Sequence, residues 1–291
     1  MDSTAPPAAV LEALTDRLHE RGRLRVWSLV VTVFGDAIVP RGGRVALAVL
    51  QELAARLRVE PGALRTALSR LAGDGWVERE RQGRNSFFSL GAQGRHAFDL
   101  ATRRIYAGGP PAWDGRWTVA IAPPGQGEAG AAELQALGFV RAAAGVYLRP
   151  DSEGAPDAAG ALSGMLVVRG ESAAHPEALR ELWPSRETAA AYDAFIAAFS
   201  PLRARLAGGA ALLPLDAMAA RTLLIHEWRR IVLRDPGVPP ALWPRDWPGE
   251  AARGLARDIY AALLAPSESW LDAAGLPPVS DPVRFAWRWR A

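Results

Sequence analysis

Four polar side chains between residues 65 and 70 have the chemistry and spacing of a DNA-contacting surface. They lie close enough in sequence for one helix face to carry all of them, and they are Arg65, Thr66, Ser69 and Arg70. A guanidinium can donate two hydrogen bonds to guanine O6 and N7, and hydroxyl groups can bind bases or phosphates. A solvated helix face is the alternative interpretation of the same pattern.

A helix from about Pro61 to Gly73 would position these side chains. Proline is tolerated in the first turn of a helix, because its missing N–H needs no partner there. Apolar residues at helical spacing would form the opposite, buried face, and they are Leu64, Ala67, Leu68 and Leu71. Gly73 and Gly75 are then expected to end the helix.

Two short strand-like runs, WVERER and SFFSL, follow this helix and are joined by a turn at residues 82–85. Alternation places arginines on one strand face and Trp76 on the other. The candidate DNA contacts on this hairpin are Arg79, Arg81, Arg84 and Asn85. An arginine-bearing helix followed by a basic hairpin is typical of the recognition helix and wing of a winged helix-turn-helix.

The residues before this pair would supply the other core helices of a small DNA-binding domain. An apolar run at 25–34 predicts the first helix, and an apolar stripe at 46–57 predicts the second, with a turn at Gly35-Asp36 between them. Arg41 and Arg44 flank a glycine pair and are candidate phosphate contacts, with simple surface charge as the alternative. Residues 1–20, rich in Ala and Pro, predict a loose N-terminal extension.

Charge is distributed in the way that phosphate neutralisation requires. The net charge over 291 residues is only +3, but residues 1–106 hold 16 Arg against 11 acidic residues, a formal +5, and the remainder carries −2. All 34 basic residues are arginine. The chain has no cysteine, which excludes disulfides, thiolate nucleophiles and cysteine-ligated zinc.

No residue constellation predicts catalysis, a metal or a cofactor. The four histidines do not pair at ligand spacing, and no nucleophile–base set stands out.

The first 22 residues lack an apolar secretory segment, and no apolar run approaches the roughly 18 residues of a spanning helix. We therefore expect a cytoplasmic protein with no membrane partner.

A second group of residues, near the C-terminus, could form a ligand pocket. His226, Arg229 and Arg230 would share one helix face, and Trp243 and Trp247 follow in the chain. Aromatic walls with arginines suit an aromatic ligand that bears a carboxylate or phosphate. The alternative is an interdomain or dimer contact held by Arg–Asp pairs.

Gly125, Gly127 and Gly130 form a G-x-G-x-x-G pattern between an expected strand and an expected helix. Such a loop can bind a dinucleotide pyrophosphate, which would make the chain a nucleotide-dependent enzyme. Two prolines separate the strand from the glycines, and only a short α+β stretch follows. A surface loop is the alternative that this context favours.

The whole chain is expected to be α+β. Gly94–Tyr106 predicts a linker helix, alternating strands and helices follow, and helices dominate after residue 187. The predicted parts are an N-terminal extension (1–22), a winged-helix DNA-binding domain (23–91), a linker helix (92–111), a ferredoxin-like central domain (112–186) and a helical C-terminal domain (187–291).

Several segments, in order along nearly the whole chain, resemble the PaaX family of transcriptional repressors of phenylacetic acid degradation. They are SLVVTVFGDAIVPRGG at 28–43, LRTALSRLAGDGWVERERQGRNSFFSL at 64–90, ATRRIYA at 101–107, GFVRAAAGVYLRP at 138–150 and HEWRRIVLRDPGVPPALWPRDWPG at 226–249. The resemblance implies the three-domain fold given above, with residues 187–291 as the effector and dimerisation domain. It also implies a homodimer that binds double-stranded operator DNA and is released by an aromatic acyl-CoA, typically phenylacetyl-CoA.

One departure from the family is the run PPGQGEAGAAELQALGF after Ala122, where relatives usually carry a basic helix.

The leading hypothesis is a repressor of an aromatic-compound catabolic operon that an aromatic acid or its CoA thioester releases from DNA. The alternatives are an enzyme that uses the Gly125–Gly130 loop, and a DNA-binding protein without a small-molecule effector.

Overall fold

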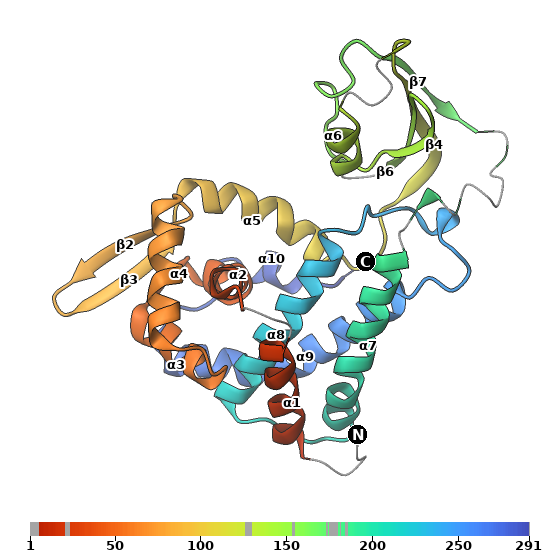
Figure 1. Ribbon diagram of the computed structural model, residues 1–291. Helices are drawn as coiled ribbons and strands as arrows, with labels where there is room; N and C mark the ends of the chain where they lie inside the picture. The colour runs from red at the N-terminus through yellow and green to blue at the C-terminus, as the bar shows by residue number, and fades with distance from the viewer. Residues whose placement is uncertain are drawn as a thin grey trace. The chain divides into compact units, whose positions relative to one another are not determined.

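The computed structural model describes residues 6–20, 24–125, 130–152, 155–172, 174, 180, 182–183 and 186–290, and contains two compact units (Figure 1). Unit 1 comprises Met1–Gly108, Ala194–Arg230 and Ala251–Ala291, and unit 2 comprises Gly109–Asp193 and Ile231–Glu250. This division differs from the predicted one, because most of the C-terminal helical residues pack with the N-terminal 108 residues. Mixed helix and sheet confirm the α+β class.

The N-terminal residues of unit 1 form a helix, α1 (Pro7–Glu20), where a loose extension was expected. Its apolar residues recur at helical spacing and are buried, namely Val10, Leu11, Leu14 and Leu18. Leu11 has no exposed surface. Burial of this stripe explains why the Ala- and Pro-rich residues 7–20 form a helix.

The predicted core helices and hairpin are confirmed as elements. In chain order they are α2 (Val26–Val33), β1 (Arg44–Ala46), α3 (Leu47–Arg56), α4 (Pro61–Gly73), β2 (Val77–Gln82) and β3 (Asn85–Leu90). The turn expected at Gly35-Asp36 is wrong. Residues 34–38 continue α2 as a π-helical segment, η1 (Phe34–Ile38), and a 3₁₀ turn, η2 (Val39–Arg41), follows.

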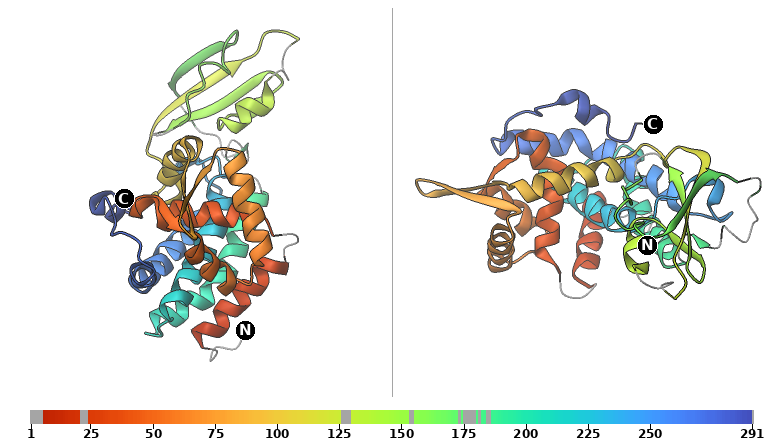
Figure 2. Two further views of the ribbon diagram at one scale, coloured as in Figure 1. Left: turned by 90° about the vertical axis from the view of Figure 1, so that its left-hand side faces the viewer. Right: turned by 90° about the horizontal axis from the view of Figure 1, so that it is seen from above.

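The three strands form an antiparallel sheet in the order β1-β3-β2. Gln82 pairs with Asn85 at the end of the hairpin, so Gly83 and Arg84 form its turn. Gly83 has a φ of 61°, in the left-handed region that favours glycine. The hairpin projects away from the helices of unit 1 (Figure 1; Figure 2, right).

The linker helix α5 (Ala92–Ile105) packs closely against the start of η1. A Cβ at Gly35 would lie 2.5 Å from the ring of Phe98, so only glycine allows this approach without a shift. At the other end of α5, the indole Nε1 of Trp228 donates to the carbonyl of Ile105 at 2.7 Å. The linker helix is therefore an integral part of unit 1.

The predicted C-terminal helices are also confirmed. They are α7 (Arg186–Ala207), α8 (Pro214–Val232) and α9 (Gly249–Ala273), and a short α10 (Pro282–Ala286) follows them. Within unit 1, α8 and α9 supply fully buried side chains such as Leu224, Trp228 and Leu263.

Unit 2 is built around a four-stranded antiparallel sheet. Its elements are β4 (Trp113–Ile121), α6 (Ala131–Ala136), β5 (Val140–Ala143), β6 (Val146–Ser152) and β7 (Leu166–Glu171). The strand order is β5-β6-β4-β7. Leu134 of α6 packs with Ala120, Phe139 and Tyr147 in one hydrophobic cluster, so the helix covers one face of the sheet.

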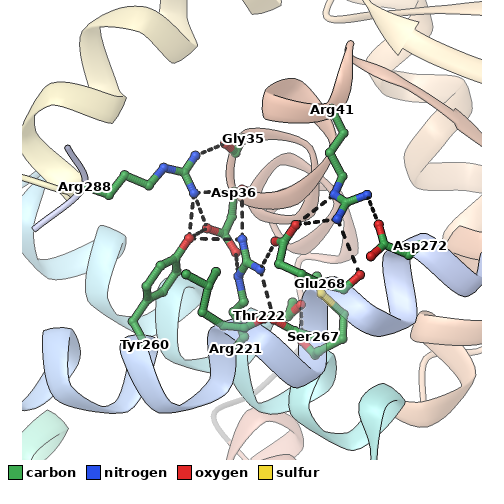
Figure 3. A network of polar contacts seen from close by, with 12 residues as sticks. Gly35, Asp36, Arg41, Arg221, Thr222, Tyr260, Ser267, Glu268, Asp272 and Arg288 are labelled. Atoms are coloured by element: carbon green, nitrogen blue, oxygen red, sulfur yellow. Dashed lines mark hydrogen bonds and ion pairs between the residues drawn. The ribbon is translucent and has the colours of Figure 1, made fainter. Parts of the chain in front are cut away.

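A buried network of charges in unit 1 connects the segment after α2 with the C-terminal helices (Figure 3). Asp36 accepts hydrogen bonds from Arg221 at 2.7 Å and from Arg288 at 3.0 Å, and from the hydroxyls of Tyr106 and Tyr260. Glu268 extends the network, because it pairs with Arg221 at 2.6 Å.

Arg41 forms the other end of this network. Its guanidinium pairs with Glu268 at 2.6 Å and with Asp272 at 2.7 Å (Figure 3). Because Glu268 also binds Arg221, one carboxylate joins Arg41 and Arg221. The network therefore spans α8, α9 and the segment between α2 and β1.

The ionised form of Asp36 stabilises the folded state. Burial by itself raises the pKa of this carboxyl, but Arg221 and Arg288 outweigh burial and hold the pKa below the ordinary value of 3.8. A pKa lowered in the folded state contributes stability above the pKa of the unfolded chain. This contribution is lost as the pH falls through the lower, folded pKa.

We expect Asp36→Asn to lower the free energy of unfolding at pH 7 by about 3–5 kcal/mol, because two buried arginines lose their shared carboxylate. Chemical denaturation at several pH values measures this difference. It should begin to shrink as the pH falls below 3.8, where the unfolded chain takes up the proton, and should vanish as the pH falls through the lower, folded-state pKa of Asp36. Asp258→Asn, at an exposed ion pair with Arg203, is the control and should change stability little. Equal effects of the two substitutions would contradict the assigned role of Asp36.

Candidate nucleic-acid interface

The exposed face of α4 carries the four side chains singled out in the sequence. Arg65, Thr66, Ser69 and Arg70 are all exposed, while Leu64, Ala67, Leu68 and Leu71 are buried. The buried face packs against α2 and α3. One helix therefore presents two arginines and two hydroxyls together to solvent.

The two arginines on this face differ in their local partners. Arg70 lies 3.7 Å from Asp74 and has its guanidinium 6.0 Å from the ring centre of Trp27. Arg65 makes no ion pair or side-chain hydrogen bond within the described residues. An exposed pair such as Arg70–Asp74 is weak, so it leaves Arg70 available to a stronger anion.

The β2–β3 hairpin carries the second set of predicted contacts. Arg79, Arg81, Arg84 and Asn85 are all exposed, and Arg79 donates to the hydroxyl of Ser86 at 2.9 Å. Arg84 lies in the turn, beside Gly83. In the part of the chain that the structure describes, Arg81 and Arg84 have no ion-pair partner. The turn of the hairpin thus carries Arg84, which has no ion-pair partner among the described residues.

Arg44 lies at the base of the same sheet. It is half-buried, its guanidinium lies 3.7 Å from the ring centre of Phe87, and its Nε donates to Glu80 at 3.2 Å. Since Arg44 pairs with Ser89 in the β1–β3 register, it belongs to the hairpin surface. Its contact with phosphate stays a prediction.

Arg41 is a correction to the sequence-based set. Its side chain is only 4% exposed and is bound by Glu268 and Asp272, so it has no free donor to offer a phosphate. The adjacent glycines suggested an exposed loop. Its carboxylate partners lie more than 220 residues further along the chain, where no local pattern reveals them.

The three predicted effector residues on α8 do not share one helix face. His226 and Arg229 turn toward α2, where both contact the hydroxyl of Thr32. Arg230 does not share their face, because it is exposed and lies 3.7 Å from Glu227 of its own helix. Neighbouring helical residues are about 100° apart, which separates Arg229 from Arg230.

Trp243 and Trp247 belong to unit 2, whereas the three α8 residues belong to unit 1. Trp243 packs with the cluster of Trp117, Trp183, Val238 and Leu242, and its Nε1 donates to the carbonyl of Val238 at 2.7 Å. Trp247 lies edge-on to Tyr192, with ring centres 5.5 Å apart. Each tryptophan thus has a packing partner within unit 2.

The glycine loop lacks the surroundings of a dinucleotide site. Gly125 and Gly130 have φ angles of 83° and 74°, and Gly127 lies outside the described residues. The sheet beside the loop is antiparallel, whereas a dinucleotide-binding unit uses parallel strands joined by a helix. These features favour the surface-loop interpretation.

Among the described residues, no group of three or more histidines or acidic side chains could hold a metal ion. Within the same residues, no helix combines the length and the apolar character needed to cross a membrane.

Sequence reasoning missed the carboxylate on which unit 1 depends. Asp36 was assigned to a turn, although it has only 2% exposure in the structure. Arg221 and Arg288 were not singled out at all. The one local signal was a lone acid within an apolar run, and such a residue has to be paired if it is buried.

The chain is similar to two family models and to a solved structure. A family model described as "PaaX-like protein" matches residues 25–94, and one described as "PaaX-like protein C-terminal domain" matches residues 183–273. A solved structure of an uncharacterised Mycobacterium tuberculosis protein, Rv0674, has a TM-score of 0.51 and 23% identity, covering 80% of this chain and 92% of that one. This likeness supports the fold alone.

A relative with a functional name is the transcriptional repressor PaaX of Escherichia coli K12. It is 32% identical over 279 residues, which cover 89% of this chain and 88% of the repressor. At this identity and coverage the two proteins share their ancestry over nearly their whole length. The chain therefore belongs to the PaaX family.

Proposed function

We propose that the chain is a sequence-specific DNA-binding repressor of an aromatic-compound catabolic operon. Family membership assigns it to the transcriptional regulators rather than to the enzymes. The observation that carries the specific proposal is the exposed face of α4, where Arg65 and Arg70 lie with two hydroxyls and without a strong internal partner.

The DNA-binding domain is a winged helix-turn-helix in this proposal. The three helices α2, α3 and α4 and the sheet β1-β3-β2 support it, as does the projecting hairpin with Arg84 in its turn. The recognition helix α4 would enter a major groove, and the hairpin would reach phosphates or the neighbouring minor groove.

The central sheet of unit 2 has the ferredoxin-like arrangement in this proposal. If β4, β5, β6 and β7 are numbered one to four in chain order, the order of strands across the sheet is two-three-one-four. All neighbouring strands are antiparallel. The helix α6 follows the first strand, as a β-α-β-β-α-β fold requires. This order supports the fold name.

The repressor acts as a homodimer in this proposal, with two α4 helices meeting successive major grooves of a palindromic operator. An aromatic acid or an aromatic acyl-CoA such as phenylacetyl-CoA is the effector. It releases the operator only if it binds the DNA-free state more tightly than the DNA-bound state.

Arg65→Ala and Arg70→Ala should each weaken binding to operator DNA from the chain's own promoter region by roughly 1–3 kcal/mol if these arginines contact bases. Fluorescence anisotropy at fixed salt measures the affinity. Arg203→Ala, an exposed arginine on α7, is the matched control for the lost charge and should leave affinity nearly unchanged. Footprinting that protects no site in that region would contradict the proposal.

Arg84→Ala should weaken operator and random DNA alike, because a turn arginine that meets phosphate does not read sequence. The slope of log K against log salt should fall in magnitude by about 1. Anisotropy titrations over a salt series measure it. A loss confined to the operator, with an unchanged slope, would assign base contact to Arg84 instead.

Phenylacetyl-CoA is expected to dissociate the protein from a labelled operator fragment, and acetyl-CoA, which lacks the aromatic ring, is the control. Gel-shift titration with both thioesters and with phenylacetate measures release. If none of a wider panel of aromatic acids and thioesters dissociates the complex, the chain binds DNA without a small-molecule effector.

A further inference from the structure

A polar stripe runs along α2 and its continuation η1, on the side that faces α8. Ser28, Thr32 and Asp36 are spaced four residues apart, so they lie along one helix face. The facing residues on α8 are Arg229, His226 and Arg221. Each polar side chain of the stripe makes a hydrogen bond to this opposite set.

The two ends of the stripe differ in charge balance. At the Asp36 end, Arg221 and Arg288 share a carboxylate, and Arg221 also has Glu268. At the Ser28 end, Arg229 has only neutral acceptors. Its Nε donates to the hydroxyl of Thr32 at 2.7 Å, and its Nη2 donates to the carbonyl and hydroxyl of Ser28 at 2.8 and 2.6 Å.

Within the described residues, no carboxylate pairs with Arg229. The nearest charged neighbour on its own helix is Arg230, which is occupied by Glu227. Burial, reinforced by Arg230, lowers the pKa of Arg229 to about 10, so the guanidinium is still charged at neutral pH. A cation in this position is stabilised by any anion that reaches it.

Part of the Arg229 side chain is exposed to solvent. The residue is only partly buried, and its Nη1 makes no hydrogen bond in the ranges that the structure describes. A guanidinium binds carboxylate and phosphate groups through two parallel N–H donors, and Arg229 keeps one terminal nitrogen for such a contact.

We propose that Arg229 is an anion-binding residue that takes a carboxylate or phosphate oxygen of the effector. This inference rests on the proposed function, which supplies an effector that carries one of these groups. The contact lies on the C-terminal side of α8, at the end of the stripe where charge is uncompensated.

A small anion fits this position better than a DNA phosphate does. The opposite side of α2 packs toward α3 and α4, where Leu29, Val30 and Val33 line a small apolar cavity with Leu50 and Leu64. Arg229 therefore contacts the side of α2 that faces away from the recognition helix.

The same geometry gives the ligand a route to the DNA-binding face. An anion on Arg229 competes for donors that now hold Ser28 and Thr32, and α2 packs directly against α4. Loss of these hydrogen bonds changes the support of the recognition helix, which is the differential contact that a population shift needs.

The experiment uses the full chain with Arg229→Gln, and with Arg230→Gln as the control, since both remove one positive charge from adjacent positions. Isothermal titration with phenylacetate, coenzyme A, phenylacetyl-CoA and inorganic phosphate gives the affinities. Any probe that binds the wild type should bind Arg229→Gln at least tenfold more weakly and Arg230→Gln within twofold. Loss of phenylacetate binding identifies a carboxylate, and loss of coenzyme A or phosphate binding identifies a phosphate.

Operator binding by the same proteins separates this inference from the proposed function. Wild-type protein that binds operator DNA but none of the four probes would overturn the anion site and leave the repressor intact. Wild-type ligand affinity in Arg229→Gln, or an equal loss in Arg230→Gln, would overturn it as well.

A measurement on the wild type covers the case in which Arg229→Gln does not fold. Phenylglyoxal modifies accessible arginines, and mass spectrometry locates the product. A saturating probe should protect Arg229 and leave Arg230 reactive. Equal modification of Arg229 with and without the probe would overturn the inference.

Discussion

The buried carboxylate of Asp36 is the interaction on which the arrangement of unit 1 depends. A charge with 2% exposure is tolerable only when it is fully paired, and Arg221 and Arg288 provide that pairing from positions 185 and 252 residues away. The N-terminal and C-terminal segments of the chain must therefore come together in one particular way. Glu268, which binds both Arg221 and Arg41, makes the arrangement a connected network rather than a single pair.

The helix that leads to Asp36 also packs against α4, the proposed recognition helix. One side of α2 packs against α3 and α4, and the other side presents Ser28, Thr32 and Asp36 to α8. The candidate recognition helix is thus held by a helix whose second face belongs to the C-terminal segment. A repressor needs such a connection if ligand binding at the C-terminal helices is to change its affinity for DNA.

The arginines show where prediction from sequence succeeds and where it stops. Arg65 and Arg70 were placed on an exposed helix face by the periodicity of the leucines around them, and the helix bears this out. Arg41 had an equally plausible local context and was assigned wrongly. Arg41 is buried because it binds Glu268 and Asp272, which lie 227 and 231 residues further along the chain. The residues next to Arg41 in sequence give no indication of such a distant contact. The same limit applies to His226 and Arg229, whose shared partner Thr32 lies 194 and 197 residues earlier in the chain.

The sequence by itself determined the local elements: the α4 helix with its Pro61 start and the hairpin with Gly83 in its turn. These depend on apolar periodicity and on the backbone preferences of proline and glycine, which act within a few residues. Tertiary structure alone decided that α1 is buried, that residues 34–38 stay helical, and that the C-terminal helices join the N-terminal ones. Each of these outcomes depends on side chains that meet across long stretches of chain, where burial and charge pairing outweigh local preference.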